Sequence, residues 1–386
     1  MSKLDFKIEK ALRKRKYRKR KKLRALLTAA LAIPGLGLSA VSHAQSIPDA
    51  PQIWVQYGNY RDFQAQKEAR MRVNEPMLLY DVPVEQKADF QGSFVVDTMS
   101  GASPFYFSTL SGASGVGIHD SRYAADGKVT RYFDNFSFGI GGTVSKENDY
   151  FSRGIVIDAR VWTPDKNTVV SFGVNPQGDH VTSTNDPMLD EVREDQSYLL
   201  GVTQVLDQNS IGQSNVTYEH NGGYLSDPYK IFDNRPENRD RYAWLNRYVQ
   251  YIPWAEASFH ADYRLYFDSW GVTSHTIALA WYQPVGAGWM VRPDIRYYTQ
   301  SRAEFFDNVY PPQTQGMLYT ADQRLGDFGG ITTGLKITKD IGHGVTLDGI
   351  FEVMDQRPNF KLGGHESSPI DAFYAMWFVF GLTKTF

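Results

Sequence analysis

The sequence of 386 residues contains no cysteine. This absence excludes a disulfide framework, a cysteine-ligated zinc site and a thiol nucleophile. Mean hydropathy is low, which disfavours an α-helical membrane protein, because such a protein needs apolar stretches of about 20 residues. Disorder is disfavoured as well, since 14% of the residues are aromatic and disordered chains are poor in aromatic side chains. The length suits one large domain or two ordinary ones.

Positive charge is scarce outside the first 44 residues. Residues 1–44 hold 13 Lys and Arg against 2 Asp and Glu, whereas residues 45–386 hold 28 against 41, a formal net charge of −13. Nucleic-acid phosphates attract positively charged surfaces. We therefore expect no nucleic-acid partner for the body of the chain.

The first 44 residues have the pattern of a secretory signal peptide. The basic run KRKYRKRKK at 14–22 precedes a mostly apolar stretch at 23–40, and Ser42-His43-Ala44 supplies small residues before Gln45. These three parts in this order predict a signal peptide at 1–44, cleaved near Ala44, and an exported body at 45–386. An uncleaved anchor helix is the alternative, which the Pro-Gly interruption within the apolar stretch disfavours.

The body shows alternation at period two rather than a helical period. In 255–268, 289–300 and 345–354, apolar residues alternate with charged or polar ones over about 10 to 14 positions. That is the length of a tilted membrane-spanning strand, with one apolar face and one polar face. A soluble β-sandwich would show the same alternation, so the period alone does not decide between the two.

The lengths of the connections favour a barrel. We expect sixteen strands, near 53–62, 69–83, 88–98, 126–133, 136–146, 150–163, 168–176, 195–206, 211–221, 239–252, 255–268, 272–284, 289–302, 326–339, 344–355 and 371–386. The even-numbered connections are tight, and all the long loops are odd-numbered. This predicts an all-β, transmembrane antiparallel β-barrel of the Gram-negative outer membrane, with short periplasmic turns, long extracellular loops and both termini periplasmic.

Aromatic residues and the chain terminus agree with this fold. Aromatic side chains gather near strand ends, as in the two girdles at the lipid headgroups, so outer-membrane lipid is an expected partner. The last strand, PIDAFYAMWFVFGLTKTF, has an apolar face and ends at Phe386. A terminal Phe on an apolar strand looks like the signal read by the barrel-assembly machinery.

Several ordered segments resemble one bacterial family. They are DTMSGASPFYFSTLSGAS (97–114), KVTRYFD (128–134), SKENDYFSRG (145–154), LLGVTQVLDQNS (199–210), GYLSDPYKIFDNRPENRD (223–240), DYRLYFDSWGVTSHT (262–276), RYYTQS (296–301) and YTADQRL (319–325). The chain is thus similar to the outer-membrane barrels of domain-of-unknown-function family 3570, from about residue 52 to the terminus. The resemblance implies fold and location but no activity. Genes of the family often neighbour those of small lipoproteins and a periplasmic flavin transferase, which implies at most an accessory role with periplasmic or lipoprotein partners.

The predicted inward faces carry charges of both signs. The expected lumen-lining residues are Asp158, Arg160, Glu256, His260, Asp262, Arg264, Asp268, Arg292, Asp294, Arg296, Asp348 and Glu352. Such charges can set a transverse field that selects permeating solutes. Alternatively they pair across strands and fill the interior, which the close interleaving of signs slightly favours. Sixteen strands are enough to leave an aqueous channel.

Two predicted loops are rich in acidic residues, and another, the first long loop, carries a repeat. The acidic residues are Asp179, Asp186, Asp190, Glu191, Glu194 and Asp195 in one loop and Asp227, Asp233, Glu237 and Asp240 in another. Oxygen ligands of this kind could hold Ca²⁺, but no EF-hand spacing is present, and solvated surface is the commoner role. No other cofactor is indicated. The doubled Ser-Gly-Ala-Ser at 100–103 and 111–114 favours a loop that folds into the lumen over a flexible surface loop.

Enzyme activity has weak support in the sequence. His260 with Asp262, His119 with Asp120, and His180 with Asp179 could belong to a hydrolase, yet no lipase elbow or zinc His pair accompanies them. We therefore expect a non-enzymatic barrel, a porin-like conduit for a solute. A non-conducting scaffold that binds envelope partners through its long loops is the second hypothesis, and a barrel-embedded hydrolase is the third.

Overall fold

The structure, a computed structural model, describes most of the chain after residue 47. The described ranges are 48–64, 66–85, 87–101, 118–183, 186–230, 233–307, 309, 316–364 and 372–386. The predicted signal peptide at 1–44 lies outside these ranges, as does the second Ser-Gly-Ala-Ser segment. Within them, no α-helix has the length and apolar character needed to cross a bilayer.

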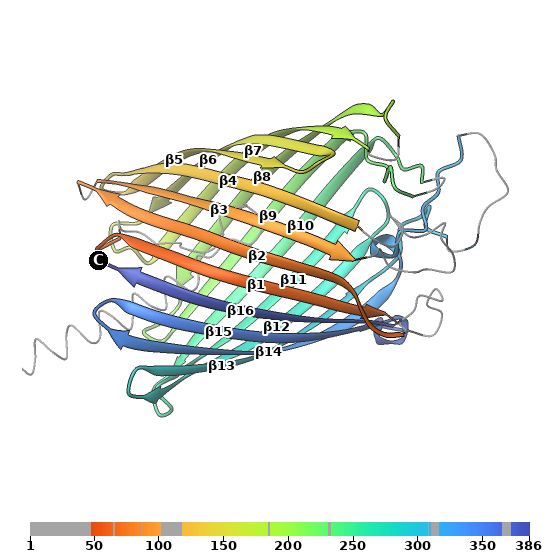
Figure 1. Cartoon of the computed structure of the whole chain (residues 1–386). Helices are drawn as coiled ribbons and strands as arrows, with labels where there is room; N and C mark the ends of the chain where they lie inside the picture. Colours follow the sequence, from red (N-terminus) through yellow and green to blue (C-terminus); the bar gives the residue numbers. More distant parts are fainter. Residues whose placement is uncertain are drawn as a thin grey trace, which may run out of the picture.

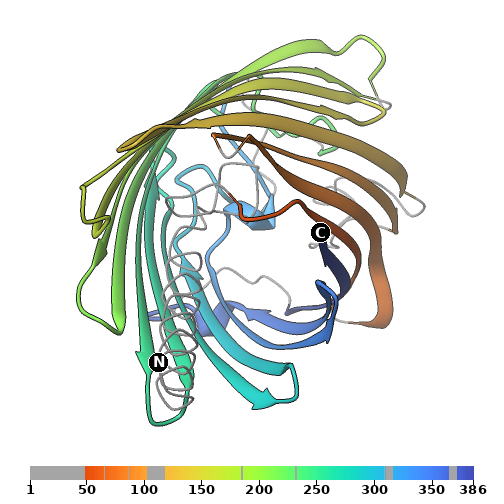
Figure 2. The same ribbon diagram turned by 90° about the vertical axis from the view of Figure 1, so that its left-hand side faces the viewer.

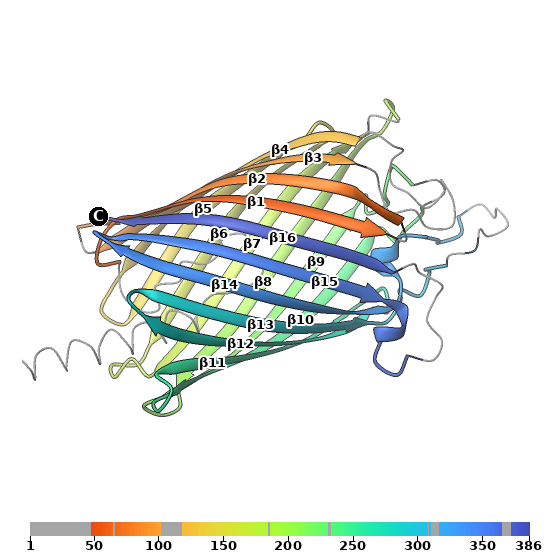
Figure 3. The ribbon, with the colours of Figure 1, turned by 60° about the horizontal axis from the view of Figure 1, so that its bottom comes forward.

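Sixteen antiparallel strands form one closed barrel, as the sequence predicts (Figure 3). Each strand pairs with its neighbours in the sequence, and β1 closes the ring against β16, where Trp54 lies opposite Thr383. The strands are β1 (Gln52–Gln64), β2 (Gln66–Val84), β3 (Ala88–Gly101), β4 (Ile118–Tyr132), β5 (Phe136–Lys146), β6 (Tyr150–Trp162), β7 (Thr168–Thr182), β8 (Asp190–Val205), β9 (Ser210–Gly223), β10 (Asn238–Ile252), β11 (Ala257–Asp268), β12 (Thr273–Gly286), β13 (Trp289–Gln300), β14 (Phe328–Gly342), β15 (Val345–Arg357) and β16 (Phe373–Thr385). Two short 3₁₀ helices, η1 (Gln323–Leu325) and η2 (Pro358–Phe360), lie in connections.

The two mouths of the barrel differ. The C-terminus and the tight turns lie at one end, and the longer connections lie at the other (Figure 1). Among the residues that the structure describes, five non-glycine residues have positive φ, and all of them sit in tight turns at the first end: Glu85, Lys166, Glu256, Ala287 and His343. Such left-handed positions let a short turn follow the twist of a β-hairpin. This asymmetry is the one expected of an outer-membrane barrel.

Three predicted strand boundaries are wrong by five or more residues, and two of them have one cause. β4 begins at 118 rather than 126, β7 continues to 182 rather than 176, and β8 begins at 190 rather than 195. In β7 and β8 the acidic residues looked like a loop, but Asp179 pairs with Arg193 across these two strands. A polar side chain is no strand breaker when one face of the strand is wet. The fourth correction concerns Glu256, which lies in the turn before β11 rather than on a strand.

Burial in this barrel is the inverse of that in a soluble protein. Apolar side chains such as Ile295, Val55 and Phe351 are about half exposed on the outer face, at 47%, 52% and 48%. Asp62, Asp81 and Asp89 are instead among the most buried residues. Because large apolar surfaces are unfavourable in water, the outer face requires a hydrocarbon solvent. The inner face, in contrast, is polar.

Substituting arginine for Ile295, on the outer face of β13, tests the assignment of faces. We expect Ile295→Arg to lower the unfolding free energy of the lipid-inserted barrel by about 2–4 kcal/mol, because a charge would face hydrocarbon. Asp294→Asn, on the opposite face, should cost much less. Denaturant titration of both variants in lipid vesicles measures the difference, and equal losses would mean that the faces are wrongly assigned.

Candidate functional site: the barrel lumen

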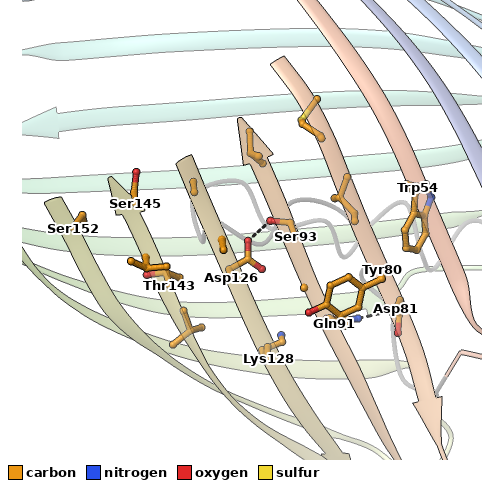
Figure 4. Close-up of a pocket in the computed structure, with 18 of the residues that line it drawn as sticks. Trp54, Tyr80, Asp81, Gln91, Ser93, Asp126, Lys128, Thr143, Ser145 and Ser152 are labelled. Carbon is orange, nitrogen blue, oxygen red and sulfur yellow. Dashed lines mark hydrogen bonds between the residues drawn. The ribbon is translucent and has the colours of Figure 1, made fainter. Parts of the chain in front are cut away.

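A cavity of about 800 Å³ lies on the inner side of the barrel wall. Residues of β1 to β8 line most of it, and Lys336 of β14 and Asp348 of β15 complete it. Figure 4 shows part of this lining, with Ser93 and Asp126 side by side on β3 and β4. The described interior therefore contains open space and is not packed solid by side chains.

One buried ion pair spans three strands of this wall. Lys128 of β4 donates to Asp158 of β6 over a distance of 2.9 Å, and both residues are less than 10% exposed. β5 lies between them, and a Cβ on its Gly139 would stand 2.6 Å from Oδ1 of Asp158. Glycine at 139 is therefore what lets the pair close across β5.

Carboxylates outnumber cations around the cavity. Asp126 accepts from Ser93, and its Oδ2 atom has no hydrogen-bond partner. Asp89, just behind the lining, accepts from the neutral side chains of Gln91 at 3.3 Å and Tyr132 at 3.0 Å. The nearby cations Arg122 and Lys128 are already paired with carboxylates of their own. This part of the wall thus carries a net negative charge.

The opposite wall carries most of the predicted lumen residues, and four of their carboxylates form ion pairs there. Arg247 of β10 donates to Asp262 at 3.0 and 2.9 Å, and Arg239 donates to Asp268 at 3.0 Å. The further contacts are Arg292 to Asp294 at 3.2 Å, Arg296 to Thr332 at 3.2 Å, Lys336 to Asp348 at 2.9 Å and Arg264 over the ring of Tyr266 at 5.9 Å. Glu352 lies opposite Gly334 and Trp377 in the sheet, and Arg160 lines the cavity.

The sequence analysis named only one partner in four of these pairs. Lys128, Arg239, Arg247 and Lys336 are the partners of predicted residues, yet none was singled out. Arg239, Arg241 and Arg247 share one face of β10, so their common parity was a usable signal. No signal in the sequence places Lys128 beside Asp158, because that contact depends on the register of three strands.

The histidines do not form a catalytic relay in the described residues. His260 lies 3.3 Å from the hydroxyl of Ser258 and stacks on Tyr282 at 4.3 Å, while Asp262 accepts from Arg247 instead. His180 pairs with Asp190 at 2.5 Å, not with Asp179. The side chain of His119 lies outside the description. This geometry gives the hydrolase hypothesis no support.

At the long-loop end, the described parts of three connections pack into one assembly. Trp270, Val272, Ala303, Phe306 and Leu325 form its apolar cluster. An isolated bridge joins Asn234 to Tyr319, and part of the assembly lies within the outline of the barrel when viewed from the other end (Figure 2). These connections narrow the long-loop mouth.

An ionic network ties this assembly together. Asp322, 2% exposed, accepts from Arg235 and from Arg324, each at 3.0 Å. Burial would raise the pKa of Asp322, but the charges of Arg324, Lys230 and Arg235 outweigh it and hold the pKa well below its ordinary value. Asp233 also pairs with Arg235, at 2.7 Å. The ionised form of Asp322 therefore stabilises the assembly.

The acidic residues of the predicted calcium site lie mostly in strands rather than in loops, and the structure does not test whether they bind calcium. Asp179, Asp190, Glu191, Glu194 and Asp195 belong to strands, and Asp227 and Asp233 are engaged by Lys230 and Arg235. Across the described ranges, no group of three or more metal-ligating side chains converges. Calcium binding stays a prediction from the sequence.

Comparison with known proteins identifies the family. The profile described as "Protein of unknown function (DUF3570)" matches residues 107–193 and 182–370, which is more than half of the chain. The chain belongs to the DUF3570 family. The expected resemblance began earlier, near residue 52, and the match supports it from 107 onward. No curated protein matches this DUF3570 chain at a significant level.

Solved structures similar to this DUF3570 protein are outer-membrane barrels. CdiB from Acinetobacter baumannii has a TM-score of 0.51 at 7% identity, over 87% of this chain and 60% of that one. A bacterial polysaccharide outer membrane secretin has 0.49 at 8%, over 88% and 99%. A Pseudomonas aeruginosa FadL homologue has 0.45 at 11%, over 94% and 96%. At these identities the likeness concerns the fold alone.

Alanine at position 139 tests the ion pair across β5. Gly139→Ala should lower the unfolding free energy by about 1–3 kcal/mol, because the new methyl group displaces Asp158. Gly349→Ala is the matched control, since a Cβ there meets nothing within 4 Å. Unfolding in lipid vesicles measures both, and an unperturbed Gly139→Ala variant would contradict the role given to this glycine.

Asparagine at position 322 tests the ionic network. Asp322→Asn removes one of the two carboxylates that pair with buried Arg235. We expect the loop assembly to lose about 3 kcal/mol of stability, which is the lower end of the range for a broken buried ion pair. The lower end applies because the other partner, Arg324, is 69% exposed and can be solvated by water. Hydrogen exchange over 316–327 measures this loss.

Acid should loosen the wild-type assembly. Because the folded-state pKa of Asp322 is lowered, its contribution is complete above about pH 4 and declines at lower pH. Faster exchange over 316–327 as the pH falls from 5 to about 3, absent in Asp322→Asn, is the expected result. Identical pH profiles in the two proteins would contradict it.

Proposed function

We propose that this DUF3570 barrel is a conduit that conducts polar solutes and prefers cations. The observation that carries the proposal is the open, charged cavity on the inner wall, where carboxylates exceed cations. Charged rings along a pore select permeating ions by sign. The buried Lys128–Asp158 pair and the paired opposite wall hold the lining in place without filling the cavity.

Asp126 is the residue on which the preference depends most directly. It lines the cavity, accepts from a neutral hydroxyl and has one oxygen without a partner. Its charge is therefore less compensated than that of Asp158. Passing cations are attracted to such a site, and anions are repelled.

Conductance in a planar bilayer tests the proposal. We expect discrete current steps and, under a KCl gradient, a reversal potential of the sign that cation preference gives. Asp126→Asn should move that potential toward zero, whereas Asp240→Asn, which removes an acid from the outer face, should leave it unchanged. A folded barrel that never conducts would contradict the conduit, and a conducting barrel with anion preference would contradict the role of the carboxylates.

A scaffold role is the second candidate, favoured by apolar residues at the long-loop end. Met317 and Leu318 are 48% and 44% exposed on the packed loop assembly. Without a protein partner, these apolar side chains would contact water. Exposed apolar groups on an ordered surface favour a protein partner. Reproducible capture of an envelope or lipoprotein partner, lost in Met317→Ser/Leu318→Ser, would support this role, and capture that is unchanged by the substitutions would oppose it.

Assembly in the outer membrane is part of the same proposal. Phe386 is 68% exposed, beside the start of β1, where its backbone N–H donates to Pro51. At this position the Phe386 side chain is accessible, so the assembly machinery can bind it before β1 and β16 pair. Export through a cleaved leader ending near Ala44 remains a prediction from the sequence.

A further inference from the structure

The outer face of β1 to β6 carries an unusual charge distribution near the long-loop end. Arg61, Arg72, Lys146 and Arg153 are exposed there, each on the same face of its strand as half-exposed apolar residues such as Val55 and Ile155. Among the described side chains, the outer face of these six strands carries no Asp or Glu. The four residues are called the outer basic patch below.

The cations lie at the loop-side edge of the apolar band, among exposed aromatic residues such as Tyr57, Tyr123 and Phe151. On β1 and β2, Tyr57 is followed by Asn59 and Asn74, which share a hydrogen bond of 2.8 Å, and then by the two arginines. On β4 to β6, Tyr123 lies opposite Lys146. Tyrosines mark the level of the lipid headgroups. The outer basic patch therefore lies at the height of the headgroups, on the long-loop side.

Within the described part of the chain, no acidic side chain is paired with a cation of the patch. Arg61 lies directly opposite Arg72 in the sheet, and its side chain donates to Asn59, at 3.1 Å. Lys146 and Arg153 are diagonal neighbours across β5 and β6. Like charges directly opposite each other in a sheet are destabilising. An anion held between the two guanidinium groups removes that cost.

The rest of the outer wall is different at the same level. Glu194 of β8 and Asp240 of β10 lie on the outer face there, and Asp240 accepts from Tyr218 and His220 at 2.8 Å. The body of the chain is also acidic overall. The outer basic patch, with its four cations on β1, β2, β5 and β6, is thus a local feature and not the result of composition.

We propose that the outer basic patch binds phosphorylated glycolipid of the outer leaflet. Guanidinium groups bind phosphate through paired, charge-assisted hydrogen bonds, and Tyr57, Tyr123 and Phe151 pack against acyl chains and sugar below and beside them. Bound lipid bridges β1 with β2 and β5 with β6 from outside. This inference is independent of conduction through the lumen.

Native mass spectrometry of the folded full chain in detergent, titrated with bis-phosphorylated lipid A, tests the proposal. We expect wild type to bind this lipid about ten-fold more tightly than dephosphorylated lipid A. Arg61→Gln/Arg72→Gln and Lys146→Gln/Arg153→Gln should each lose about ten-fold in affinity, and Arg61→Lys/Arg72→Lys should recover part of it. Inorganic phosphate at equal concentration should not displace the lipid.

Arg131→Gln is the matched control, because Arg131 is exposed on the same outer face of β4 at the tight-turn end. It should bind lipid A as wild type does. Equal binding of phosphorylated and dephosphorylated lipid A by wild type would overturn the proposal, even if a variant fails to fold. An equal loss in Arg131→Gln, full displacement by inorganic phosphate, or dimers joined through the patch in place of lipid would overturn it as well.

Discussion

The structure depends on the hydrogen bonding of its backbone in a solvent that offers no partners. In hydrocarbon every N–H and C=O must be satisfied within the protein, and an antiparallel sheet does so only when its edges meet. The pairing of β1 with β16 removes both edges. All other features follow from this closure: side chains alternate between lipid and lumen, and the chain returns to the same mouth at which the described barrel begins.

In the closed barrel, the side chains buried at the lumen wall are mainly polar or charged, and their burial must be compensated. Here the buried groups are charged, and burying a charge is costly unless it is paired. Ion pairs between strands, such as Lys128 with Asp158 and Arg247 with Asp262, offset this cost. Where a pair must cross an intervening strand, a glycine provides the room, as Gly139 does. Because these pairs form along the wall, they leave the cavity open.

The sequence predicts what depends on one strand at a time. Period-two alternation and connection length gave sixteen strands, and β13 has the predicted start, Trp289. What depends on several strands was out of reach. Asp179 resembled a loop residue because its partner Arg193 is on a neighbouring strand, and Arg235 pairs with Asp322, which lies 87 positions away. The loop assembly and the outer basic patch are likewise visible only when distant segments lie side by side.

The absence of cysteine permits a direct test of the central claim, that one face of each strand is solvated by lipid and the other by water. Single cysteines at positions 291 to 298 of β13, in barrels inserted into lipid vesicles, would be exposed to a membrane-impermeant maleimide. We expect labelling to alternate, with the even, lumen-facing positions modified and the odd ones protected. Uniform labelling along the strand would contradict the account.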